Sequence, residues 1–152
     1  MKLVIGKGSC GIAAGAAKIH TTLLSLLENT DIAVGIAGCI GMCFLEPIVD
    51  VYEHGILLRR LVRVSQDDCE RIAKAVTTND LSLLDALTVS EEDNSFLTKQ
   101  TRIALRNCGL IDPESIDAYT QADGYKALAG CENGVASVQK NAADAEIVDE
   151  TV

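Results

Sequence analysis

The chain has 152 residues, an apolar fraction of 48% and a formal net charge of −9, which suits one domain of ordinary size or a smaller domain with an appendage. Its acidic balance repels phosphate backbones and disfavours nucleic-acid binding, and no apolar stretch reaches membrane-spanning length. Because no signal peptide opens the chain, we expect a cytoplasmic protein whose six cysteines are reduced or metal-bound.

The first half of the chain alternates between short apolar runs and helical patterns, which predicts an α/β domain of order β-α-β-β-β-α. The first crossover should make strands one and two parallel, and the last two strands should form a hairpin with a glycine in its turn. In chain order the expected elements are strand Leu3–Ile5, helix Gly11–Leu27, strands Asp31–Ile36, Ile48–Tyr52 and Ile56–Val64, and helix Asp68–Val76 with an N-cap at Ser65.

The second half is more polar and its predicted elements are helical. A polar break over Thr77–Asp80 suggests a linker, and short helices are expected at Leu81–Leu87, at Phe96–Asn107 and from Asp112, with Pro113 in the first turn. Cys131 falls in a loose, glycine-flanked region, and the acidic end over residues 141–152 is expected to fray.

Two glycine-bearing loops carry cysteines that suit a metal centre. The run Gly38-Cys39-Ile40-Gly41-Met42-Cys43 precedes Glu46-Pro47, and the run Gly6-Lys7-Gly8-Ser9-Cys10-Gly11 follows the first strand. Glycines let backbone N–H groups approach sulfur and stabilise thiolate charge. Three thiols on two loops therefore indicate an iron–sulfur site, against the alternative of small buried hydrophobic residues.

The remaining cysteines and the histidines show no ligand spacing. Cys69, Cys108 and Cys131 each lack a partner at such a spacing, so we expect structural roles for them. His20 is expected on a helix surface and His54 in the hairpin turn.

These two loops and the order of elements resemble a thioredoxin-like [2Fe–2S] ferredoxin domain, in the version fused to the front of the flavin-binding subunit of NADH dehydrogenases and NADH-linked hydrogenases. A second stretch is similar to the opening of the flavin domain in that subunit. It comprises Lys99–Gly109, Ile111–Tyr119 and Gly124–Leu128.

The resemblance implies that Cys10, Cys39 and Cys43 are ligands of a [2Fe–2S] cluster, and they match three of the family's four cysteine positions. The remaining position falls on Ile5, whose side chain cannot bind iron. The family's glycine-rich motif for FMN and NADH is absent, so no FMN or NADH site is expected here. The chain is then a component of an oxidoreductase and not catalytic alone.

We therefore expect a ferredoxin-type domain over residues 1–78, a helical extension over 79–140 and a flexible acidic tail over 141–152. The preferred function is an accessory electron-transfer module of an NADH-linked oxidoreductase complex, with flavin-binding and iron–sulfur subunits as partners. One alternative is a cluster-free docking subunit of the same type of complex, whose extension from about Phe96 is ordered by a partner. Another is a thiol redox protein with Cys10 as nucleophile at a helix start.

Overall fold

The computed structural model describes residues 1–103 and 105–141. Within them the chain forms two compact units, Met1–Ser115 and a second that begins at Ile116. Most of the expected fraying tail, and Ala104 in the middle of a predicted helix, lie outside the described residues. The predicted boundary after residue 78 falls inside the first unit and stays a prediction.

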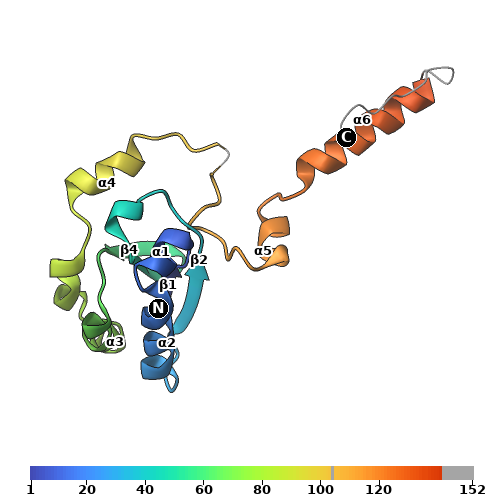
Figure 1. Cartoon of the computed structure of the whole chain (residues 1–152). Coiled ribbons are helices and arrows are strands. Elements are labelled where there is room, and N and C mark those ends of the chain that lie inside the picture. The colour runs from blue at the N-terminus through green and yellow to red at the C-terminus, as the bar shows by residue number, and fades with distance from the viewer. Residues whose placement is uncertain (104, 142–152) are drawn as a thin grey trace. The chain divides into compact units, whose positions relative to one another are not determined.

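A four-stranded sheet in the order β2-β1-β3-β4 forms the centre of the first unit (Figure 1). β1 and β2 are parallel, whereas β1 with β3 and β3 with β4 are antiparallel. This confirms the predicted crossover and the predicted hairpin, whose turn has positive φ at His54 and Gly55. The strands are β1 (Lys2–Gly6), β2 (Ala33–Ala37), β3 (Val49–Glu53) and β4 (Ile56–Leu61).

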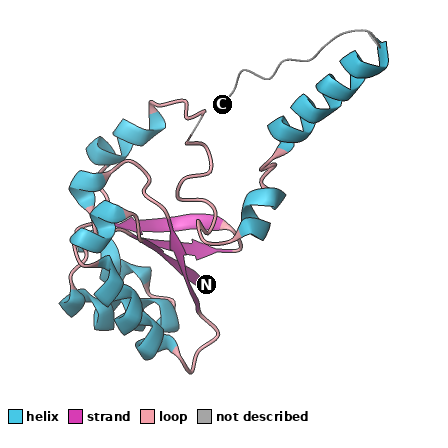
Figure 2. Cartoon of the chain, turned by 45° about the vertical axis from the view of Figure 1, so that its right-hand side comes forward, coloured by secondary structure: helices cyan, strands magenta, loops and turns pink. Residues whose placement is uncertain are grey.

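Helices cover one face of this sheet (Figure 2). Alternation along β1 and β3 turns Leu3, Ile5, Val49 and Val51 into the main core, where helices α2 and α3 pack on them. The helical elements of the first unit are α1 (Ser9–Ala13), α2 (Ala16–Leu27), η1 (Cys43–Leu45), η2 (Gln66–Asp68), α3 (Cys69–Thr78), η3 (Leu81–Leu87) and α4 (Glu91–Thr98).

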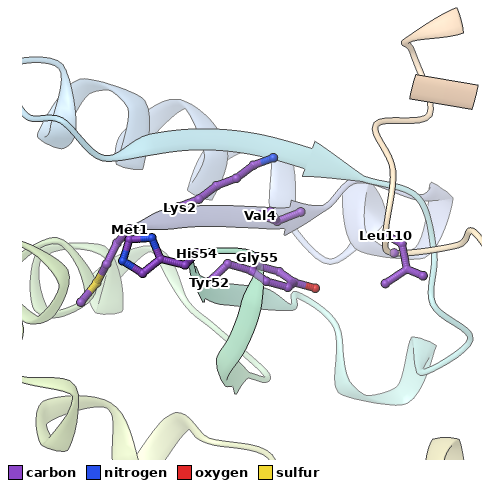
Figure 3. A pocket seen from close by; sticks show the side chains of 8 residues that line it. Met1, Lys2, Val4, Tyr52, His54, Gly55 and Leu110 are labelled. Carbon is purple, nitrogen blue, oxygen red and sulfur yellow. The ribbon is translucent and has the colours of Figure 1, made fainter. Parts of the chain in front are cut away.

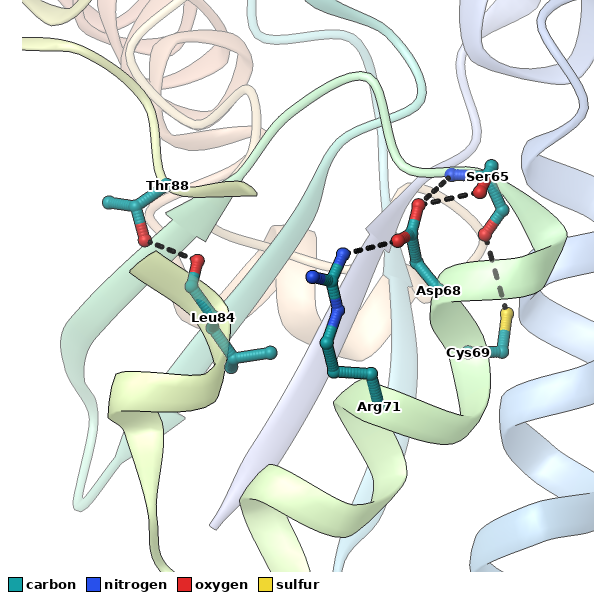
Figure 4. Close-up of polar contacts among 6 residues, drawn as sticks. All are labelled: Ser65, Asp68, Cys69, Arg71, Leu84 and Thr88. Carbon is teal, nitrogen blue, oxygen red and sulfur yellow. Dashed lines mark hydrogen bonds and ion pairs between the residues drawn. The ribbon is translucent and has the colours of Figure 1, made fainter. Parts of the chain in front are cut away.

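The predicted cap at Ser65 is confirmed and involves more side chains than expected. Ser65 and Asp68 form a capping box, and the guanidinium of Arg71 pairs with the Asp68 carboxylate (Figure 4). Burial alone would raise the pKa of Asp68, but its hydrogen bonds from Ser65 and the charge of Arg71 lower it. The first turn is a short 3₁₀ segment, η2, which leads directly into α3.

Three predicted helices differ from the structure. The single helix over Gly11–Leu27 is broken, because Gly15 adopts a φ of +106° between α1 and α2. The helix predicted over Phe96–Asn107 is wrong, since α4 ends at Thr98. The helix predicted from Asp112 begins at Ile116.

The second unit contains α5 (Ile116–Gln121) and α6 (Lys126–Asn141). The rings of Tyr119 and Tyr125 meet edge to face with centroids 5.1 Å apart, and the N–H of Gly124 donates to the carbonyl of Tyr119. Cys131 lies inside α6, so the loose region predicted around it is wrong. In the described part of the chain, no helix combines the length and the apolar character that crossing a bilayer requires.

Candidate metal centre

The two cysteine-bearing loops meet because they follow neighbouring parallel strands. β1 leads into the first loop and β2 into the second, so both loops leave the same edge of the sheet. Contact between them is close at Gly8, where an added Cβ would lie 2.7 Å from Cys39 Cβ and 2.9 Å from Cys39 N. Only glycine permits this approach, which explains part of the glycine pattern in the sequence.

The structure brings Cys39 and Cys43 together. Their Sγ atoms are 3.5 Å apart, and the N–H of Gly41 donates to Cys39 Sγ over 3.3 Å. Gly41 has a φ of +91°, and the intervening Met42 is fully buried in a small second core with Leu45, Ile48 and Val62. The methionine therefore anchors the loop while the two thiols remain nearer the surface.

The spacing of this pair suits a shared metal ion. Two thiolates on one tetrahedral ion with metal–sulfur bonds of about 2.3 Å would have sulfurs roughly 3.8 Å apart. Without a cation, burial raises the pKa of Cys39, and the neighbouring Cys43 and Glu46 add to this while the Gly41 N–H opposes it. A cation bound between the sulfurs would remove this penalty on thiolate formation.

The Glu46 side chain, which follows the second cysteine loop, contacts the first one. Its carboxylate accepts the N–H of Ile48 over 2.9 Å and lies against Gly6 and Gly11, where an added Cβ would come within 3.2 Å and 3.1 Å of its oxygens. Burial raises the pKa of Glu46, and Asp50 adds to the effect while the Ile48 N–H opposes it. The sequence showed the Glu-Pro pair but gave no sign of this bridging position.

Cys10 is the second residue of α1 and is exposed. Among the described residues, no three side chains of cysteine, histidine, aspartate or glutamate gather at a spacing that would hold one metal ion. The structure therefore unites Cys39 with Cys43 and leaves Cys10 on the adjoining loop, so its role as a ligand stays a prediction.

A four-cysteine cluster does not fit the described residues. Ile5, at the position of the missing cysteine, is fully buried in the main core. Cys69 cannot replace it, because it is fully buried and its Sγ lies 3.8 Å from the carbonyl of Ser65 (Figure 4). Burial raises the pKa of Cys69, as do Asp68 and Asp67, which suits a packed thiol.

Later segments of the first unit pack onto the second loop, which sequence reasoning did not foresee. Phe96 of α4 meets Phe44 edge to face with centroids 6.2 Å apart, and Leu97 packs on the small core around Met42. Gly109 is buried and lies so close to Ile40 that an added Cβ would be 2.1 Å from its Cγ2. Gly109 has a φ of +81°, a conformation that favours glycine. The glycine itself was therefore the sequence signal that could have indicated a special backbone position here.

A central sheet of order β2-β1-β3-β4, with paired thiols at one edge, defines a thioredoxin-like ferredoxin fold. A cysteine-to-serine variant of the thioredoxin-like [2Fe–2S] ferredoxin from Aquifex aeolicus matches with a TM-score of 0.51 at 13% identity, over 59% of this chain and 98% of that one. Another structure of a ferredoxin of this kind from the same organism gives a TM-score of 0.49 at 14% identity, over 59% of this chain and 89% of that one. The first match confirms the fold expected from the sequence.

Two sequence matches are short. The NADP-reducing hydrogenase subunit HndC of Solidesulfovibrio fructosivorans is 68% identical over 31 residues, which are 20% of this chain and 6% of that subunit. The chain thus matches only a small part of that relative's length, in agreement with the resemblance to such a subunit. A family model described as a domain of unknown function (DUF1508) matches residues 120–149, which belong to the second unit.

Proposed function

We propose that this chain is an accessory electron-transfer module of an NADH-linked flavin and iron–sulfur oxidoreductase complex. The observation that carries the proposal is the pair of sulfurs at Cys39 and Cys43, 3.5 Å apart at the loop edge of a thioredoxin-like ferredoxin fold. The short, strong identity to a hydrogenase subunit supports the same kind of complex. Flavin-binding and iron–sulfur subunits are the proposed partners.

In this proposal Cys39 and Cys43 hold iron, and Cys10 on the adjoining loop is the third protein ligand. An iron–sulfur group at this edge would supply one-electron redox chemistry. The chain's own contribution is to fix the pair, through the buried Met42 and through the N–H of Gly41 that donates to Cys39 Sγ.

Metal analysis of the chain purified without oxygen tests this function. Wild-type protein is expected to contain iron and sulfide and to absorb visible light, and Cys39→Ser or Cys43→Ser should remove most of both. Cys131→Ser is the matched control, because Cys131 is an exposed residue of α6 in the other unit. Equal iron in all three variants would contradict the assignment.

A second candidate function rests on the burial of Ile5. With no thiol at that position, the module can serve as a cluster-free docking subunit of the same type of complex. Colourless, iron-free protein that still binds a flavin-bearing partner would favour docking over electron transfer.

A further inference from the structure

A cavity of about 350 Å³ lies on the sheet face that α2 and α3 leave uncovered (Figure 3). Lys2 and Val4 of β1 point to this face, because they alternate with the core residues Leu3 and Ile5. The cavity extends along β1 from Met1 past Val4 to Gly109 and Leu110, and Gly109 contacts Ile40 of the second cysteine loop. No cysteine lines the cavity, so it does not include the thiols of the candidate metal centre, although the two share the contact of Gly109 with Ile40.

Strand pairing and two turns build the walls of the cavity. Lys2 and Tyr52 are register partners on the antiparallel strands β1 and β3, and His54 comes from the hairpin turn that follows. The Lys2 side chain lies over Gly35, whose added Cβ would come within 3.3 Å of Lys2 Cε. Leu110, the residue after the buried Gly109, forms the far wall.

The polar groups of this cavity are open to solvent and to a ligand, since Lys2 and His54 are exposed and Tyr52 is half-buried. Among the described residues, the side chains of Lys2, Tyr52 and His54 take part in no hydrogen bond or ion pair. Burial raises the pKa of Tyr52, and Asp50 adds to this while Arg60 opposes it, so the phenol keeps its proton at neutral pH. No aspartate or glutamate lines the cavity, although the chain carries a net charge of −9.

We propose that this cavity binds a small organic anion. Lys2, Tyr52 and His54 supply donors to a carboxylate or phosphate head, while Val4 and Leu110 contact a flat apolar body. The volume is that of an ordinary small-molecule site. This binding goes beyond the proposed electron-transfer role and does not depend on iron or on a partner subunit.

Amide chemical shifts of the full chain, recorded during titration with adenosine monophosphate, test the proposal. Saturable shifts are expected at Val4, Tyr52, Gly55 and Leu110, because these residues line the cavity. Adenosine and inorganic phosphate are titrated separately, and each should bind at least about tenfold more weakly, since each lacks one half of the proposed ligand. Either one binding as tightly as the nucleotide would overturn the assigned ligand class.

Two variant pairs separate a specific site from general surface binding. Lys2→Gln should weaken nucleotide binding about tenfold, whereas Lys74→Gln, on the exposed side of α3, should not change it. Leu110→Asp should abolish binding by placing a carboxylate in the cavity, with the exposed Leu105→Asp as its control. Unaltered spectra elsewhere would show that each variant is folded. Shifts spread over the surface, or Lys2→Gln without effect, would overturn the proposal.

Discussion

The absence of a side chain at position 8 allows the two cysteine loops to touch. Gly8→Ala would place a Cβ 2.7 Å from Cys39 Cβ, so one loop must move away from the other. The thiols must keep their spacing to share an ion, and Co²⁺ serves as a spectroscopic probe of thiolate binding. We expect its affinity to fall roughly 10- to 100-fold, which is the effect of losing a contact that orients a metal ligand.

Gly38→Ala is the matched control for this change. An added Cβ at Gly38 would meet only Pro113 Cβ, at an ordinary contact distance of 3.9 Å, so Co²⁺ affinity should remain close to wild type. Titration of both reduced variants, followed by the thiolate charge-transfer band, gives the comparison. If Gly8→Ala bound Co²⁺ as tightly as Gly38→Ala, the loop contact would have no role in placing Cys39.

The half-buried carboxyl of Glu46 should make stability depend on pH. Burial raises its pKa in the folded chain above that in the unfolded chain, so the folded state binds more protons in the window between the two. Stability is then lost as pH rises through that window, from the ordinary glutamate pKa near 4.3 upward. Glu46→Gln removes the charge and should be more stable than wild type at pH 7.

Urea midpoints at pH 7 and near pH 4 would measure this difference, which should shrink at the lower pH because most Glu46 carboxyls are then protonated in both states. Glu132→Gln, at an exposed position of α6, is expected to change neither midpoint. A lower midpoint for Glu46→Gln at pH 7 would show that the charged carboxylate holds the loops together and that burial costs less than this contact gains.

At the scale of elements, the sequence correctly predicted those turns and caps that depend only on neighbouring residues. The hairpin turn at His54 and Gly55 and the cap at Ser65 need only neighbouring residues, and both predictions are confirmed. The break at Gly15 has a local cause as well, but the alanines around it favour a helix on either side and hide it. Sequence periodicity alone therefore gave one helix where the structure has two.

Tertiary packing explains the elements that the sequence did not reveal. The start of α4 has its own cap, since the Ser90 side chain accepts the N–H of Asp93, and the helix then packs Phe96 and Leu97 near the cysteine loop. After α4, Ile103 and Leu105 are exposed. The apolar residues whose spacing suggested a longer helix therefore pack against no core. The same limit applies to the site, where spacing predicted the Cys39–Cys43 pair but not the bridging role of Glu46.

For the whole molecule, the first compact unit continues well past the predicted boundary at residue 78. Leu84 of η3 is fully buried in the main core, and the Thr88 hydroxyl donates back to its carbonyl over 3.0 Å (Figure 4). An isolated Leu61–Thr88 bridge also joins this region to the end of β4. Leu84 therefore belongs to the main hydrophobic core, and Leu81, Leu83 and Leu87 pack against that core.

Two truncated chains distinguish these readings of the boundary. A chain of residues 1–115 should keep the urea midpoint of the full-length protein, because it contains both hydrophobic cores. A chain of residues 1–78 should lose more than the about 2–5 kcal/mol of a single Leu→Ala change, or fail to fold, since Leu81, Leu83 and Leu87 leave the core together with Leu84. Leu84→Ala in the full chain separates loss of this side chain from loss of the segment and should cost about 2–5 kcal/mol. Equal stability of the two truncated chains would place the domain boundary at residue 78. It would also show that η3 contacts the main core without stabilising it.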